Sequence, residues 1–231
     1  MFNFIGGGTV LNIVAIIFGG LAGMFGGKFL NEKIQQTLKM SCATAVIFIG
    51  ASGTLSQMLK TESTTLLIVA LIGGGLIGEI IDIDGLFEKF GVWLRNKSGN
   101  DGDTKFVDGF VTASFTVCIG AMAVIGAIND RLLNDRTILI AKSALDLIII
   151  LVMTASLGKG CIFSCVSVGI FQGVITLFAG FLEPVMTETA LNNLSCVGNV
   201  LIFCVGINLM FGNKIRVANL LPALVIAVLW N

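Results

Sequence analysis

Histidine and tyrosine are absent from this chain of 231 residues, and charged residues make up only 12% of it. An average soluble domain has about 25% charged residues, so the chain is poor in the groups that keep a protein surface in water. Without histidine it lacks the side chain that most often acts as a general acid or base near neutral pH. No nucleophile motif or carboxylate cluster compensates, so we expect no enzyme activity. The net charge is +0 and there is no basic arm, so we expect no nucleic-acid partner.

Cysteine offers no metal site either, although the chain has six cysteines. All of them fall in or at the ends of apolar segments: Cys42, Cys118, Cys161, Cys165, Cys196 and Cys204. No pair has the CxxC spacing, and Cys161 and Cys165, which share one helix face, are only two thiols. In a bilayer, cysteine behaves as a small hydrophobic residue. We therefore expect no metal and no cofactor.

The chain has long apolar runs instead, and 55% of its residues are hydrophobic. Runs of about 20 apolar residues, long enough to span a bilayer as a helix, recur along the whole length. We expect an all-α fold, a polytopic transmembrane bundle of seven or eight helices in a single integral membrane domain, residues 1–231. The expected segments are 6–27, 40–59, 64–82, 107–128, 138–157, 161–182, 191–211 and 217–230. The last is short and contains Pro222, which leaves the count at seven or eight.

The long polar stretch, residues 84–105, contains "RNKSGNDGDTK" and is predicted to be a flexible cytoplasmic loop. Basic residues set the orientation. The odd-numbered loops hold Lys28, Lys33, Lys39, Lys89, Arg95, Lys97, Lys105, Lys159, Lys214 and Arg216, and the even-numbered loops hold Lys60, Arg131 and Arg136. This imbalance places the odd loops in the cytoplasm and the N-terminus outside. Met1 to Gly8 lacks a basic region, so the first segment is expected to be retained rather than cleaved as a signal peptide.

Glycine is arranged in ladders at four-residue spacing, which place the glycines on one face of a helix. The ladders are Gly19, Gly23 and Gly27; Gly74 and Gly78; and Gly169 and Gly173. Small residues at this spacing let helix backbones approach closely in a membrane. We expect these positions at helix contacts, within the chain or in a homo-oligomer. The alternative is close approach of the backbone to a solute or an ion.

A faint internal similarity suggests a parallel repeat of about four helices. "SCATAVIFIG" from Ser41 resembles "SCVSVGIFQG" from Ser164, and "TVLN" from Thr9 resembles "SALD" from Ser143. This register makes Asn12 equivalent to Asp146, each preceded by a hydroxyl residue three positions earlier. Helix-pair repeats built on "FIGAS", "CIGAM" and "CVGIN" are the rival interpretation.

Two charges, Lys142 and Asp146, lie four residues apart inside an apolar segment. A charge at the centre of a membrane helix costs about 2.5 to 3.5 kcal/mol, so two of them need a reason. One hypothesis is that Asp146 binds a cation or proton and that Lys142 holds an anionic group. The residues expected at such a substrate or ion site are Asp146, Lys142, Asn12, Thr9, Ser143, Gln172 and Asn208, with Thr176, Asn199 and Asn219 as further polar groups. The alternative is that the pair and Asn12 only hold two helices together and bind no ligand.

Several segments carry a resemblance to a known family: "GTVLN", "GEIIDIDGLFEKFG", "FVDGFVTASFTVCIGAMAVIGAIND", "AKSALD" and "NLLPA", in that order. Together they resemble the YdfK/YqgA-type family of bacterial inner-membrane proteins, which is classed as of unknown function. The resemblance implies a multi-pass protein of the bacterial cytoplasmic membrane, sometimes described as a transport protein, with the lipid bilayer as its surroundings. Two function classes stay open. One is a transporter of a small solute or monovalent cation, and the other is a non-transport scaffold or accessory subunit.

Overall fold

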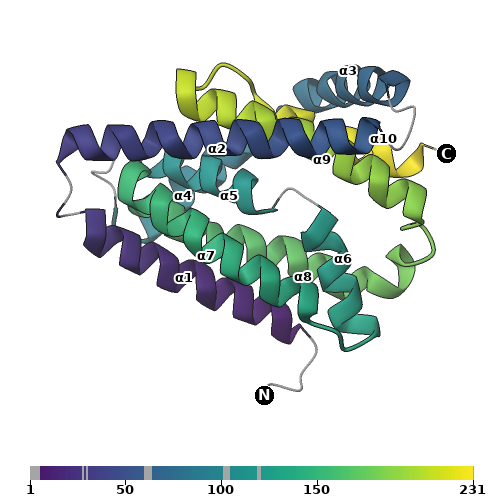
Figure 1. Cartoon of the computed structure of the whole chain (residues 1–231), viewed down its shortest axis with the longest axis horizontal. Helices are drawn as coiled ribbons and strands as arrows, with labels where there is room; N and C mark the ends of the chain where they lie inside the picture. Colours follow the sequence, from purple (N-terminus) through teal and green to yellow (C-terminus); the bar gives the residue numbers. More distant parts are fainter. Residues whose placement is uncertain are drawn as a thin grey trace.

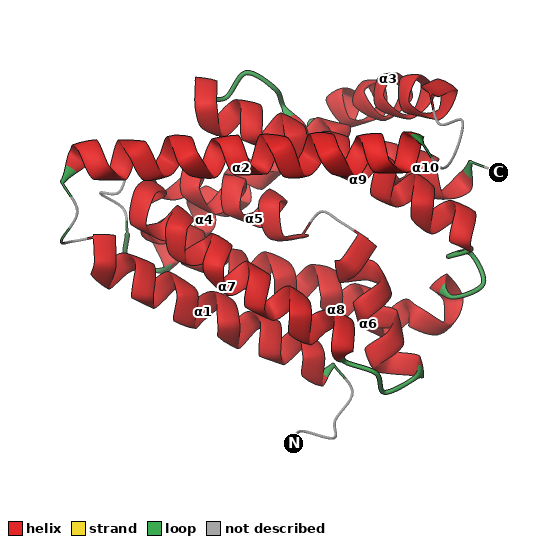
Figure 2. Cartoon of the chain, viewed as in Figure 1, coloured by secondary structure: helices red, strands yellow, loops and turns green. Residues whose placement is uncertain are grey.

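The computed structural model describes residues 6–27, 29, 31–59, 64–100, 105–118 and 121–230, and every regular element in these ranges is helical (Figure 2). The α-helices are α1 (Gly7–Gly27), α2 (Glu32–Met58), α3 (Thr64–Ile81), α4 (Ile83–Lys97), α5 (Phe106–Cys118), α6 (Ala121–Leu132), α7 (Thr137–Leu157), α8 (Ser164–Leu182), α9 (Glu188–Phe211) and α10 (Pro222–Leu229). Two 3-10 helices, η1 (Lys159–Phe163) and η2 (Val217–Leu220), precede α8 and α10. The prediction of an all-α helical bundle is confirmed.

Six helices in the described ranges are long and apolar enough to cross a membrane: α1, α2 from Gln36, α3, α7, η1 with α8, and α9. A seventh crossing results if α5 and α6, which meet at an angle of 61°, are counted as one broken span. The short apolar helix Val217–Leu229 corresponds to the last predicted segment. Large apolar side chains on five of these helices are more than half exposed: Phe18, Phe48, Ile72, Ile148 and Leu177. Such a surface is suited to lipid rather than to water.

Two stretches differ from the prediction. Most of the predicted loop 84–105 is the helix α4, and residues 101–104 of it lie outside the described residues, as do Lys28 and Lys60 of the loop count. The polar residues after position 95 suggested a loop. The residues before them, however, include both apolar and charged side chains and form an amphipathic helix that buries Gly91 and Leu94. In addition, α2 begins eight residues before the predicted start, because Asn31 caps it by accepting a hydrogen bond from Ile34 N at 2.9 Å.

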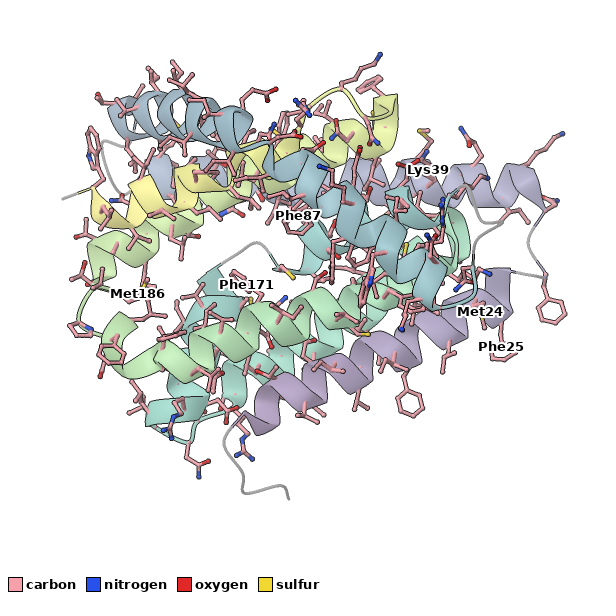
Figure 3. All side chains as sticks on the ribbon, turned by 180° about the vertical axis from the view of Figure 1, so that it is seen from behind. Met24, Phe25, Lys39, Phe87, Phe171 and Met186 are labelled. Carbon is pink, nitrogen blue, oxygen red and sulfur yellow. The ribbon has the colours of Figure 1, made fainter. Side chains whose placement is uncertain are left out.

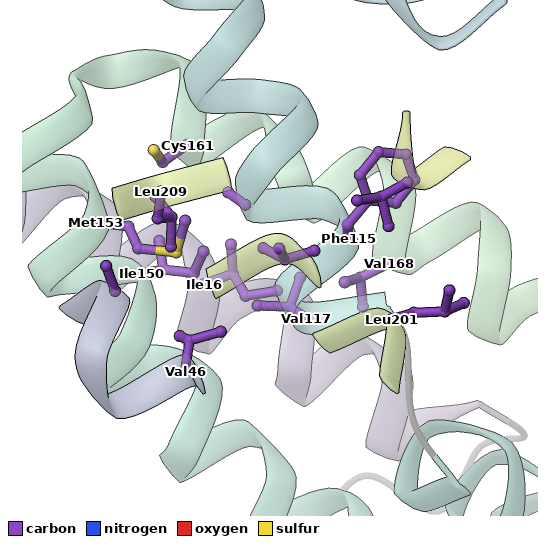
Figure 4. Packing of buried hydrophobic residues seen from close by; sticks show 14 of the residues in the cluster. Ile16, Val46, Phe115, Val117, Ile150, Met153, Cys161, Val168, Leu201 and Leu209 are labelled. Atoms are coloured by element: carbon purple, nitrogen blue, oxygen red, sulfur yellow. The ribbon is translucent and has the colours of Figure 1, made fainter. Parts of the chain in front are cut away.

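The helices form two groups, with α4 and α5 between them (Figure 1). In one group α1 packs along α7, with α8 and α6 beside them, and in the other α2 packs along α9, with α3 against α10. A large hydrophobic cluster joins the groups (Figure 4). It includes Ile16 of α1, Val46 of α2, Phe115 and Val117 of α5, and Leu201 of α9. The carboxyl end of α5 is therefore surrounded by the core.

The glycine ladders of α1 and α3 lie at helix contacts. A Cβ atom on Gly19 or Gly23 would overlap a backbone carbonyl of α7, and one on Gly27 would lie 3.2 Å from Ala155 Cα. On α3, Cβ atoms at Gly74 and Gly78 would overlap backbone atoms of Ala223 in α10 and Asn219 in η2, respectively. These two helix pairs are therefore held at a distance that only glycine permits.

The ladder of α8 differs between its two positions. A Cβ on Gly169 would lie 3.1 Å from the Ile13 side chain of α1, whereas one on Gly173 would meet no described atom within 4 Å. The expected helix contact is thus present at Gly169 and is not formed at Gly173 within the described part of the chain. A position of this kind is open to lipid or to a second chain.

The proposed repeat is not visible in the way the helices pair. In that interpretation α1 and α2 correspond to α7 and α8. The main partner of α2 is α9, whereas α8 packs mainly against α6 and α1. The two halves therefore bury their corresponding helices against different neighbours, although α1 and α7 themselves lie side by side.

Candidate functional site

An ion pair is buried in the middle of α7. Lys142 Nζ donates to Asp146 Oδ1 at 3.0 Å and to Asp146 Oδ2 at 2.8 Å. The two side chains are only 9% and 4% exposed. Residues four positions apart lie one turn apart on the same face of a helix, so the sequence spacing itself brings these charges together. Each charge therefore offsets part of the cost of burying the other.

A third side chain joins this pair from α1. Asn12 Nδ2 donates to Asp146 Oδ2 at 2.9 Å, and Asn12 is fully buried. Since a carboxylate oxygen only accepts, the amide must direct its NH₂ group toward Asp146. The Oδ1 atom of Asn12 then has no hydrogen-bond partner among the described residues. The close approach of α7 to the glycines of α1 brings Asn12 within reach of Asp146.

The fourth partner is a backbone carbonyl. Lys142 Nζ donates to the carbonyl oxygen of Val117 at 2.7 Å, and Val117 lies in the last turn of α5. The last four carbonyls of a helix have no partner within the helix and carry a partial negative charge. Because α5 ends in the core where it meets α6 at 61°, one of these carbonyls is available to the Lys142 ammonium. We name Lys142, Asp146, Asn12 and the Val117 carbonyl the α7 site.

Three further predicted residues lie on the helices of the α7 site or on α8, which packs against α1: Ser143, Thr9 and Gln172. Ser143 Oγ donates to the Leu139 carbonyl at 2.6 Å, so its hydroxyl is occupied within its own helix. Thr9 Oγ1 is buried without a hydrogen-bond partner among the described residues. The same is true of both amide atoms of Gln172. Gln172 lies one turn beyond Gly169, which contacts Ile13, so it is near the level of Thr9 and Asn12.

The sequence analysis missed a second buried carboxylate. Asp130 of α6 accepts hydrogen bonds from Gly8 N at 2.9 Å and from Arg136 Nε at 2.7 Å. Its side chain is 0% exposed. Asp130 thus places a negative charge at the amino end of α1, which has no acidic residue in its own first turn. Neither hydrogen bond follows from spacing within one helix, so no periodic signal revealed it.

The remaining predicted residues lie in other places. Asn208 Oδ1 accepts from Lys214 N and Ile215 N at 3.0 and 2.9 Å, and so closes the turn after α9. Asn199 Nδ2 donates to the Ser195 carbonyl at 2.8 Å within α9. Thr176 Oγ1 donates to the Gln172 carbonyl at 2.8 Å within α8. These are local hydrogen bonds, and the structure does not bring Asn208 or Asn199 into the α7 site.

Asn219 belongs to a second polar group, at the junction of α3 and α4. Asn219 Nδ2 donates to Glu79 Oε2 at 2.6 Å, and its Oδ1 accepts from Asp84 N at 2.8 Å. Arg216 also pairs with Glu79, and its Nη2 donates to Asp82 Oδ1 at 2.8 Å. We name these five residues the junction cluster. Apart from Asn219, the cluster is partly exposed, with Arg216 51% exposed.

Two pKa values in the junction cluster are shifted. Burial raises the pKa of Asp84 above its ordinary value, and the charge of Arg216, whose Nε lies 3.8 Å from Asp84 Oδ2, reverses this only in part. The negative charge of Glu79 raises the pKa of Arg216. Arg216 therefore stays positively charged, whereas Asp84 gains a proton more readily than an exposed carboxyl group does.

A cavity of about 80 Å³ adjoins the junction cluster between α4, α5 and α9. Its charged and amide side chains are Asp84, Glu88, Asp108, Asn208, Asn213 and Arg216. Phe115 also lines it, belongs to the core, and packs against Phe87 with ring centroids 4.9 Å apart. Two residues farther along α5, the Val117 carbonyl binds Lys142. The cavity and the α7 site thus share the helix α5, and Phe115 and Val117 of the apolar core lie between them along that helix.

Phe115 also lines a second, apolar cavity of about 470 Å³. Phe87 and Phe171 line it from α4 and α8, and Figure 3 shows them on either side of the gap between the two helix groups. Ser114 and Ser167, whose hydroxyl oxygens are 2.8 Å apart, are its polar lining residues. This cavity has the character of a lipid-facing crevice rather than of a polar route.

Comparison with known proteins gives the following matches. The family model described as "Protein of unknown function (DUF554)" matches residues 7–231. The "Uncharacterized membrane protein YdfK" of Bacillus subtilis (strain 168) is 30% identical over 219 residues, which cover 95% of this chain and 93% of that protein. The "Uncharacterized protein YqgA" of Escherichia coli (strain K12) is 25% identical over 225 residues, covering 96% of this chain and 94% of that protein. No solved structure matches the chain.

Proposed function

Since the chain belongs to the family described as "Protein of unknown function (DUF554)" and is a multi-pass membrane protein, we propose that it moves a small solute or an ion across the bacterial cytoplasmic membrane. The observation that carries this proposal is the α7 site. It places an ion pair in the interior of the bundle, at the end of a half-helix that stops within the core. Ionisable residues inside membrane proteins commonly mark solute or ion paths.

The broken α5–α6 pair supports the proposal because transporters often build their sites from discontinuous helices. The end of such a helix offers backbone carbonyls to a cation without the expense of exposing them to lipid. Here the Val117 carbonyl already binds a cationic group, the Lys142 ammonium. The same helix lines the polar cavity beside the junction cluster with Asp108 and Thr112. α5 therefore connects the α7 site to a polar opening.

The arrangement of polar and apolar regions agrees with a closed state of such a path. At one end, Asp130 and Arg136 form a polar group at the start of α1. Toward the other end, apolar residues that include Phe115 and Val117 separate the α7 site from the cavity. Transport in this interpretation requires the helix groups to move so that the core opens to one side at a time.

A scaffold or accessory subunit is the second candidate, and one observation favours it. Both oxygens of the Asp146 carboxylate accept hydrogen bonds, from Lys142 and Asn12, so the site is well paired as it stands. A pair of this kind can fix α1, α5 and α7 against one another without any ligand. In that case the buried charges give specificity to the fold, and removing both together has little effect on stability.

Transport assays in proteoliposomes separate the two candidates. Purified protein is reconstituted, and uptake of Na⁺, K⁺, protons and a panel of small metabolites is measured for the wild type and for Asp146→Asn. The matched control is Ser156→Ala, which removes a polar group on the same helix that bonds only to its own backbone. We expect uptake of at least one solute that Asp146→Asn abolishes and Ser156→Ala retains. No uptake above empty liposomes, or equal uptake by Asp146→Asn, would favour the scaffold.

A further inference from the structure

The Lys142 ammonium is enclosed by oxygen atoms. Its Nζ lies 2.7 Å from the Val117 carbonyl oxygen, 2.8 Å from Asp146 Oδ2 and 3.0 Å from Asp146 Oδ1. Two of these oxygens share one full negative charge, and the third carries the partial charge of a helix carboxyl end. Each is an atom that also ligates hard metal cations. The lysine thus holds its charge at a place where a free cation would find the same partners.

We propose that this place is a binding position for a monovalent cation, which the Lys142 ammonium occupies in the present conformation. The inference rests on the proposed transport function and names the class of ion at the same site. The ligands are the Asp146 carboxylate and the Val117 carbonyl, and beside them lies the amide of Asn12, whose oxygen does not accept from Lys142 Nζ in this conformation. In this conformation Lys142 acts as a tethered substitute for the ion.

The unpartnered oxygens beside the pair are an independent reason for this assignment. Asn12 is 0% exposed and holds Asp146 Oδ2 with its NH₂ group, yet its own Oδ1 has no donor among the described residues. Thr9 Oγ1, one turn earlier on α1 and 6% exposed as a residue, is in the same situation. A buried oxygen without a partner costs free energy unless an ion or a water binds it. Both side chains lie on α1, one turn apart, and Asn12 is the one that reaches Asp146.

The charge of the site selects a monovalent ion. Asp146 is the one carboxylate that contacts Lys142 Nζ in the described part of the chain. The same part contains no group of three or more His, Cys, Asp or Glu side chains placed to hold a metal ion. Divalent ions are usually bound by several carboxylates or softer ligands. A single carboxylate with neutral oxygens matches one positive charge.

The cation and the ammonium exclude each other, because both need the same oxygens and they repel at close range. When an ion binds, Lys142 must therefore withdraw from Val117, which its flexible four-carbon stem permits. The bound ion then takes over from the ammonium the bridge between the Val117 carbonyl of α5 and Asp146 of α7. Ion binding is in this way linked to the contact between the broken helix and the rest of its group.

The test is cation-dependent thermal stability of the purified protein in detergent. The variants are Lys142→Met, which empties the position and keeps the stem, and the matched control Lys142→Met/Asp146→Asn, which also removes the carboxylate charge. Each is measured in K⁺, Na⁺ and NH₄⁺ against N-methyl-D-glucamine at equal ionic strength. For Lys142→Met we expect the melting temperature to rise with the concentration of at least one of the three ions, by about 5 °C or more at a hundredfold excess over Kd. The double variant is expected to show no such rise.

Equal melting temperatures of Lys142→Met in all four salts would overturn the inference. If Lys142→Met does not fold in N-methyl-D-glucamine, recovery of folded protein when it is purified in K⁺, Na⁺ or NH₄⁺ supports the inference. Failure in every salt, with the double variant folded, overturns it. The assay measures binding and not flux, so the two proposals fail separately. If the wild type transports a solute but the melting temperature of Lys142→Met does not respond to any cation, only the cation position is ruled out. If Lys142→Met responds to a cation but the wild type shows no uptake, only transport is ruled out.

Discussion

At the scale of single residues, the buried charged side chains among the described residues are Asp130, Lys142 and Asp146, and each has a charged partner. Asp130 pairs with Arg136, and Lys142 pairs with Asp146. Both pairs also hold α1, through Gly8 N and Asn12 Nδ2, respectively. Leaving one member of a buried pair alone costs much more than removing both. Substitutions that break one pair should therefore be more harmful than losses of exposed charge.

We predict that Asp130→Ala destabilises the protein by about 3 kcal/mol. The change leaves the Arg136 guanidinium, whose side chain is only 18% exposed, without its carboxylate and removes the acceptor of Gly8 N. Glu183→Ala is the control, because Glu183 is an exposed carboxylate, and a change there should stay within about 0.5 kcal/mol. Denaturant or thermal unfolding in one detergent measures both. Similar losses for the two variants would contradict the role given to Asp130.

Asp84 is expected to make the stability of the folded protein fall as the pH rises. Since burial raises its pKa above the ordinary 3.8, the folded protein binds this proton more tightly than the unfolded chain does. The resulting stabilisation is complete below pH 3.8 and is lost as the pH rises through the raised pKa. We expect Asp84→Asn to remove this part of the pH dependence, so that its melting temperature falls less than that of the wild type on going from about pH 4 to pH 7. Parallel curves for the two proteins would contradict the assignment.

At the scale of helices, α1 offers two glycines for a direct comparison. A methyl group on Gly23 would overlap the Leu151 carbonyl and lie 3.0 Å from Thr154 Cβ, whereas one on Gly26 would meet no described atom within 4 Å. We predict that Gly23→Ala destabilises by about 1–3 kcal/mol through overpacking. Gly26→Ala should be neutral or stabilising by up to about 1 kcal/mol, because alanine favours helix over glycine. The free energies of unfolding of the two variants, measured in the same detergent, test this prediction. Equal stabilities would contradict the claim that Gly23 is needed for the close packing of α1 on α7.

The helices could be predicted because their signals are local. Apolar runs located the apolar helices, although the predicted segment 107–128 is two helices, α5 and α6, that meet at 61°. The spacing of Lys142 and Asp146 predicted their pairing on one helix face. The match of "TVLN" with "SALD" only made Asn12 and Asp146 equivalent positions, whereas the alternative in which the pair and Asn12 hold two helices together predicted their contact, and these side chains do meet. The Val117 carbonyl could not be found this way, because every residue has a backbone carbonyl and only the interruption of α5 exposes this one. Asp130 was missed because its partners come from α1 and from the turn before α7.

At the scale of the whole molecule, the directions of packed helices are all consistent with alternating crossings. Gly19 and Gly23 meet Leu147 and Leu151 in the same order, so α1 and α7 run parallel. The same kind of contact shows that α2 runs antiparallel to α9 and that α3 runs antiparallel to α10. It also shows that α8 runs antiparallel to α1 and parallel to α5. Seven alternating crossings, with α5 and α6 counted as one broken crossing, produce these relations, and the short α10 runs in the direction that an eighth crossing would take. The crossings therefore place consecutive loops on opposite sides.

The excess of lysine and arginine in the odd loops then predicts which side is the cytoplasm, because basic loops are retained there. Ser98 follows α4, in the third loop, and Thr187 caps α9, in the sixth. We predict that a cysteine at position 98 is cytoplasmic and one at position 187 is external. In a background without the native cysteines, a membrane-impermeant maleimide added to intact cells should label position 187 at once and position 98 only after lysis. The reverse pattern would invert the orientation, and labelling of both positions in intact cells would contradict alternation itself, because an odd number of crossings separates these two sites.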